Sequence, residues 1–186
     1  MVHNKNMVLG RSLEAQPLNR LRLSVRGLAN WILDYADRQQ LGVTNMALNK
    51  LLFFSLEKAL IERGELLTEA RIEAWDHGPV FREVYHAFKQ HGDKPIRSRV
   101  EFYSTESQTV ERSKVTLSTE LATFLAESIT PLLSLSASTL RNMSHIPQGA
   151  WHLAWNYEGH ANPGMEITPA SILAAAGIGG SYDDER

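Results

Sequence analysis

Apolar residues recur at helical spacing through the first half of this chain. Between Leu21 and Gln40, one face of a predicted helix carries Leu28, Trp31, Ile32, Tyr35 and Ala36. A second helix is predicted to begin after Thr44, which suits the N-cap, and to run to about Arg63, with Gly64 ending it. Because apolar residues cover most of its circumference, we expect this second helix to lie at the centre of the core.

The segment IEAWDHGPVFREVYHAF, residues 72–88, combines an alternating stretch, a chain reversal and an amphipathic helix. The alternation at its start predicts an extended piece or a short strand. The reversal is predicted at His77-Gly78-Pro79, because glycine adopts backbone angles closed to other residues and proline suits the first turn of a helix. The helix that follows has one apolar face, formed by Phe81, Val84, Tyr85 and Phe88.

The second half of the chain predicts several short elements. Residues 96–117 favour two short strands, arranged as a hairpin around the polar run Ser104–Gln108. Further helices are predicted over Thr119–Ser128, where Pro131 breaks the helix, over Ser134–Met143, from Trp151 to about Tyr157, and from Pro169, behind a Thr168 cap, to Gly177. The predicted fold class is mainly α with a small β element (α+β), as a single compact helical domain with a short strand pair or hairpin. This domain spans residues 21–176, between a flexible arm (1–20) and a flexible Gly-rich tail (177–186).

Composition narrows the classes of protein to consider. Of the 186 residues, 43% are hydrophobic and 22% charged, which indicates a folded core and not a disordered chain. No cysteine is present, which excludes disulfides, thiolate metal sites and a cysteine nucleophile and fits a cytoplasmic protein. The net charge of −2 gives no general attraction to nucleic acid or to an anionic membrane. Since no signal peptide or long apolar run is found, we expect a cytoplasmic location and no membrane partner.

Motifs that would carry catalysis or bind a cofactor are not found. The seven histidines are not at metal-ligand spacing, and there is no GxSxG elbow, P-loop or GxGxxG fingerprint before a helix. We therefore expect no metal, no cofactor and no enzymatic activity. One alternative stays open, a small hydrolase that uses His145 with a nearby acid.

Nucleic acid is not an expected partner. Lys94, Arg97 and Arg99 could contact phosphates, but three charges bind weakly at cellular salt. The second predicted helix is also too apolar to lie in a major groove. A surface for a protein partner is favoured instead around Trp151 and Trp155, which are spaced i, i+4 and lie close to Tyr157, because such amphipathic aromatics contribute strongly when buried at interfaces.

Several short motifs occur in an order and spacing that resemble one known family. They are Lys50-Leu51-Leu52-Phe53-Phe54, Glu73-Ala74-Trp75, Gly78-Pro79-Val80 with Val84 and Tyr85, and then Leu140, Ser144, His145 and Trp151. Over residues 28–176 the chain resembles the Panacea antitoxin domain family, which includes SocA-like antitoxins and many prophage-encoded proteins.

The resemblance implies a non-enzymatic protein that neutralises a cognate toxin by direct contact and has no catalytic residues to carry over. One lineage of the family looks like a proteolytic adaptor, which leaves delivery of a toxin to an ATP-dependent protease as an alternative. The matched positions His145 and Trp151, together with Trp155 and Tyr157, are the predicted partner-binding residues. The other matched positions are predicted to be structural: Lys50, Glu73, Trp75, Gly78, Pro79 and Tyr85.

Overall fold

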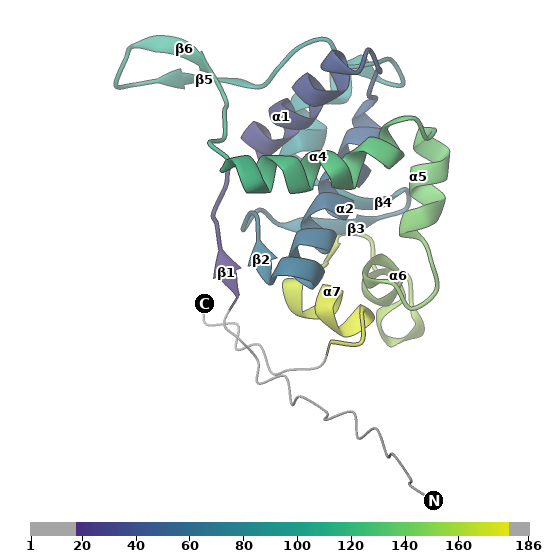
Figure 1. Ribbon diagram of the computed structural model, residues 1–186. Helices are drawn as coiled ribbons and strands as arrows, with labels where there is room; N and C mark the ends of the chain where they lie inside the picture. The colour runs from purple at the N-terminus through teal and green to yellow at the C-terminus, as the bar shows by residue number, and fades with distance from the viewer. Residues whose placement is uncertain (1–17, 179–186) are drawn as a thin grey trace, which may run out of the picture.

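The computed structural model describes residues 18–178, and within them the fold is mainly helical with three small sheets (Figure 1). The expected class, α with a minor β element, is confirmed. The long helix α2 (Asn45–Arg63) lies at the centre and contacts five other α-helices, as its apolar circumference predicted. The elements around it are α1 (Val25–Arg38), α3 (Arg82–Phe88), α4 (Thr119–Leu133), α5 (Ala137–Ser144) and α7 (Pro169–Ala175).

Local capping chemistry sets the ends of the main helices. The Thr44 side chain accepts a hydrogen bond from the amide of Ala47, and Gly64 ends α2 in the left-handed region at φ 64°. Thr168 caps α7 in the same way, through the amide of Ser171, and proline stands in the first turn of that helix. The predicted caps are therefore confirmed at both helices.

The strands form three separate sheets. A parallel pair joins β1 (Asn19–Arg20) to β2 (Glu65–Leu66). A three-stranded antiparallel sheet has the order β4 (Gly78–Phe81), β3 (Ile72–Trp75) and β7 (Met165–Glu166). The predicted hairpin is confirmed as β5 (Glu101–Ser104) and β6 (Thr109–Arg112). Strand β1 begins the described chain before the expected domain boundary at residue 21, whereas residues 1–17 of the expected arm and 179–186 of the expected tail lie outside the described residues.

Two predictions about proline are wrong. Pro79 lies in strand β4 and not in the first turn of a helix, since α3 begins only at Arg82. Strand β4 is the edge of its sheet, where a residue without an amide hydrogen is tolerated. Pro131 does not break its helix, because α4 continues to Leu133. Pro131 and the residue one turn before it, Glu127, are both exposed, so the carbonyl that loses its amide partner lies on the solvent side.

The last two α-helices of the described chain, in residues 150–175, pack against each other, and the first of them also packs on the three-stranded sheet. Helix α6 (Ala150–Trp155) packs on α7 and on β3, and two short 3-10 turns, Lys89–His91 and Tyr157–Gly159, follow α3 and α6. No single helix in residues 18–178 has the length and hydropathy of a membrane span; α4 and α5 meet that test only as a pair bent by 112°.

Candidate functional site

The turn between β3 and β4 is built around a buried lysine. Lys50, from α2, is 1% exposed, and its Nζ donates a 2.8 Å hydrogen bond to the carbonyl oxygen of Pro79. Gly78 has φ 95°, and a Cβ there would lie 2.5 Å from Ser144 Oγ and 2.7 Å from Lys50 Cε. Only glycine fits, because a side chain would overlap both neighbours in a backbone conformation that L residues avoid.

Burial, together with the nearby charge of Arg141, lowers the pKa of Lys50 to about 7. A neutral lysine beside a serine could in principle serve as a base for a nucleophile. Lys50 and Ser144 are both buried, however, and Ser144 Oγ donates to the carbonyl of Arg141 at 2.7 Å. Both side chains are thus enclosed by the core and hydrogen-bonded to main-chain carbonyls.

His145 joins α5 to the same turn. Its Nδ1 lies 2.6 Å from the carbonyl oxygen of Arg141, and its Nε2 lies 3.2 Å from that of Asp76. Burial lowers the pKa of His145, against the two carbonyl contacts that favour its charged form. In the neutral ring, a proton on Nδ1 would donate to the nearer carbonyl, that of Arg141. Among residues 18–178 no carboxylate pairs with His145, so the hydrolase alternative has no assembled acid–base pair.

The predicted aromatic surface is largely packed inside. Trp151 is only 6% exposed, its indole N–H donates to the carbonyl of Trp75 at 2.9 Å, and its ring lies 3.6 Å from that of His145. Trp155 stacks on Trp151 at 5.5 Å and is half-buried, whereas Tyr157 is 53% exposed. A role in partner binding for His145, Trp151, Trp155 and Tyr157 stays a prediction. Of the three aromatic residues in this set, Trp155 and Tyr157 are the ones that a partner could reach.

The structural positions predicted from the motifs are brought together around this turn. Trp75 packs edge-on against Tyr85 at 4.9 Å, and its indole N–H donates to the carboxylate of Glu73 at 2.9 Å. With Lys50, Gly78 and Pro79, these residues surround the β3–β4 turn.

Sequence reasoning missed a set of buried asparagines. Asn49 Oδ1 accepts a 2.9 Å hydrogen bond from the amide of Phe81, the N-cap residue of α3. The side chain of Phe81 cannot cap this helix, so Asn49 supplies a polar contact at its start from α2. Asn45 donates to the carbonyl of Tyr85 at 3.0 Å. The sequence does contain a sign of these contacts, because the asparagines occupy positions on otherwise apolar helix faces. A side-chain amide buried at such a position needs hydrogen-bond partners.

A third asparagine holds the base of the β5–β6 hairpin. Asn30, in α1, donates to the carbonyls of Val100 and Ser113 and accepts from the amide of Val100, all within 2.9 Å. Gly27, one turn earlier, lets the chain after β6 lie directly on α1, because a Cβ there would stand 2.7 Å from the carbonyl oxygen of Lys114.

Charges on α1 hold the same hairpin base from the outside. Asp34 accepts from Arg99 at 2.8 Å and also from Arg112, while Asp37 accepts from Arg99. Burial would raise the pKa of Asp34, but these two guanidinium groups outweigh it and hold the pKa below its usual range. Arg99, one of the three basic residues considered for phosphate binding, is therefore committed to two carboxylates.

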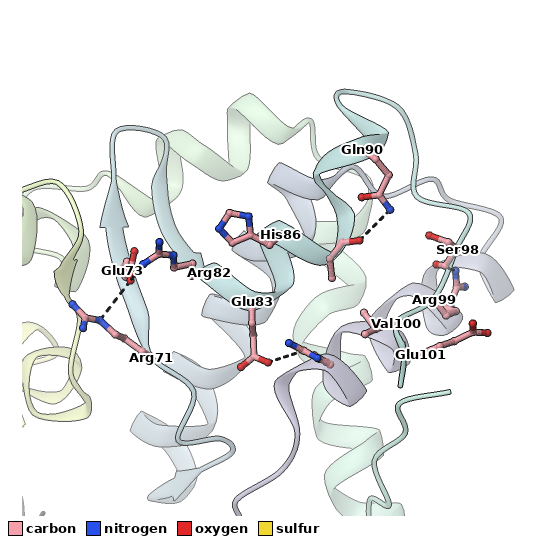
Figure 2. Close-up of a pocket in the computed structure, with 12 residues that line it drawn as sticks. Arg71, Glu73, Arg82, Glu83, His86, Gln90, Ser98, Arg99, Val100 and Glu101 are labelled. Carbon is pink, nitrogen blue, oxygen red and sulfur yellow. Dashed lines mark hydrogen bonds and ion pairs between the residues drawn. The ribbon is translucent and has the colours of Figure 1, made fainter. Parts of the chain in front are cut away.

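A groove of about 980 Å³ lies between the sheet, α3 and the approach to β5. Figure 2 shows the side chains that line it. Its charged side chains are mostly paired: Arg26 lies 2.8 Å from Glu83, and Arg71 lies 3.6 Å from Glu73. A second cavity of about 570 Å³ shares Arg26, Glu83 and Val100 with it and extends beside the hairpin. Within residues 18–178 no three histidine or acidic side chains gather in a way that could hold a metal ion.

The geometry thus offers buried polar groups that hold the fold, a mixed-charge groove and an exposed hairpin. The family described as "Antitoxin SocA-like, Panacea domain" matches residues 48–152, which span from α2 to α6. Antitoxin SocA of Caulobacter vibrioides is 30% identical over 141 residues, which cover 74% of this chain and 73% of that relative. No solved structure matches. On these matches, the chain belongs to the SocA-like, Panacea domain family of antitoxins.

Proposed function

We propose that this protein is an antitoxin that neutralises a toxic protein by binding it directly. The observation that carries the antitoxin role is the family match across residues 48–152. The relative with 30% identity is likewise named as an antitoxin. Direct binding of the toxin further requires a surface on this protein that suits a protein partner.

The surface supports binding through its exposed apolar residues. Within residues 18–178, large hydrophobic side chains are open to solvent on the β5–β6 hairpin and from the last turn of α5 to the 3-10 turn after α6: Phe102, Tyr103, Val110, Met143, Ile146, Leu153 and Tyr157. Apolar groups gathered in this way are typical of surfaces that meet a protein partner. The titratable groups considered for catalysis, Lys50 and His145, are instead occupied by main-chain carbonyls.

Co-expression with the product of the adjacent open reading frame tests this proposal. That product should arrest growth when expressed alone, and this protein should restore growth and co-purify with it in a fixed stoichiometry. Restored growth without a purified complex would refute direct binding. If rescue disappears in a host that lacks ATP-dependent proteases, the protein acts as a proteolytic adaptor, whereas sequestration predicts unchanged rescue.

A further inference from the structure

The β5–β6 hairpin extends away from the helical body (Figure 1). Within residues 18–178 its two strands pair only with each other. Tyr103 stands opposite Val110, and Phe102 stands opposite Glu111. Since neighbouring residues of a strand point to opposite faces, Tyr103 and Val110 share one face and Phe102 lies on the other.

Both faces of this hairpin carry exposed apolar side chains. Tyr103 is 62% exposed, Val110 64% and Phe102 46%. A two-stranded hairpin usually packs one apolar face against a core, and an isolated one is barely stable in water. Here the body covers neither face fully, so a partner that covered them would remove aromatic and aliphatic surface from water.

The hairpin is nevertheless held firmly at its base. Asn30 makes three hydrogen bonds to the main chain on both strands' extensions, and Asp34 binds both Arg99 and Arg112. A binding element that is already fixed in place loses less conformational entropy when a partner docks. This anchoring makes the hairpin a suitable arm for recognition.

Charge indicates which kind of partner fits. Glu101 and Glu106 are exposed and make no ion pair within the described chain, while Arg112, the one basic residue of residues 101–112, is bound to Asp34. The arm is therefore acidic, which disfavours nucleic-acid phosphates and anionic membranes. A basic protein surface would be attracted to it, because complementary charges steer association.

We propose that the β5–β6 hairpin is the arm that holds the toxin, and that it docks on a toxin surface with an apolar centre and a basic rim. This rests on the proposed antitoxin function. The toxin covers Tyr103 and Val110, and a neighbouring toxin segment enters the cavity of about 570 Å³ that Phe102 and Glu111 line. Glu101 and Glu106 meet the basic rim.

The first test reverses charge without changing the strands' apolar residues. The double variant Glu101→Lys/Glu106→Lys should weaken binding of the purified adjacent-frame product at least about tenfold in isothermal titration calorimetry, mainly through slower association. The matched control is Asp93→Lys/Glu127→Lys, which changes the net charge equally at two exposed sites away from the hairpin. The control should bind within about twofold of wild type. Equal effects in the two variants would overturn the charge argument.

The second test removes the apolar residues but keeps strand propensity. Phe102→Thr, Tyr103→Thr and Val110→Thr together should weaken binding at least about a hundredfold, because threonine retains the β preference and removes the buried surface. The matched comparison replaces the other exposed set, Met143→Gln, Ile146→Gln and Leu153→Gln. A loss of binding there as large as that of the hairpin variant would overturn the hairpin as the arm that holds the toxin. Unchanged circular dichroism and melting temperature show that both variants are folded.

The outcomes separate this inference from the proposed function. If the wild-type protein fails to bind the toxin, direct neutralisation is refuted together with the arm. If the wild type binds and both hairpin variants bind equally well, only the arm is refuted. If the purified protein is a dimer in ultracentrifugation and the threonine variant is a monomer, the hairpin's occupant is a second copy and the proposal is overturned.

Discussion

Replacing Gly78 with alanine tests whether the β3–β4 turn depends on close packing. Two separate penalties follow from the structure. A side chain at φ 95° costs about 1–2 kcal/mol in backbone conformation. The new methyl also overlaps Ser144 Oγ at 2.5 Å and Lys50 Cε at 2.7 Å, and overpacking of this kind costs about 1–3 kcal/mol.

Together these penalties lower the free energy of unfolding by about 2–5 kcal/mol, a large share of what a domain of this size has. The melting temperature should fall by roughly 4–20 °C. Urea unfolding followed by tryptophan fluorescence measures the loss, and the slope against urea should stay constant if the native surface is unchanged.

Gly164 provides a matched control. It has φ 81°, and a Cβ there would meet no atom within 4 Å. Gly164→Ala should therefore lose only the conformational part, about 1–2 kcal/mol. If both variants lose the same stability, the overlap argument is wrong. A double-mutant cycle with Ser144→Ala should recover about 1 kcal/mol in the Gly78→Ala background, because the nearest obstructing atom is gone.

Two further predictions concern buried polar groups. Asn30→Ala should leave the main-chain groups of Val100 and Ser113 unsatisfied, so limited proteolysis should cut between residues 100 and 113 at least about tenfold faster while α2 stays protected; equal cutting of wild type and variant would contradict the anchoring role. Burial raises the pKa of Glu57, in α2, to about 7. Between about pH 4.5 and pH 7 the native state holds a proton that the unfolded state has released, so the free energy of unfolding falls as pH rises through this range. Glu57→Gln should remove this pH dependence. At pH 8 it should raise the free energy of unfolding, measured by urea unfolding, by at most about 3 kcal/mol. A parallel pH dependence in the two proteins would refute it.

The sequence predicted the elements whose signals are local. Helix α2 follows from Thr44, its apolar circumference and Gly64, all of which act within a few residues. The hairpin follows from alternating strands around a polar turn. The family motifs also singled out Lys50, Gly78 and Trp75, because residue types at a fixed spacing can be recognised in the sequence alone.

Contacts between distant segments were decided only in the tertiary structure. Pro79 suits a helix start or an edge strand equally well, and pairing with Ala74 placed it in β4. Trp151 has the same helical spacing whether it faces a partner or the core. In the structure it is buried, and its indole N–H donates to the carbonyl of Trp75. Asn30 finds its partners 70 and 83 residues away. Periodicity shows which face of an element is apolar, but burial and hydrogen-bond partners depend on which other segment packs against that face.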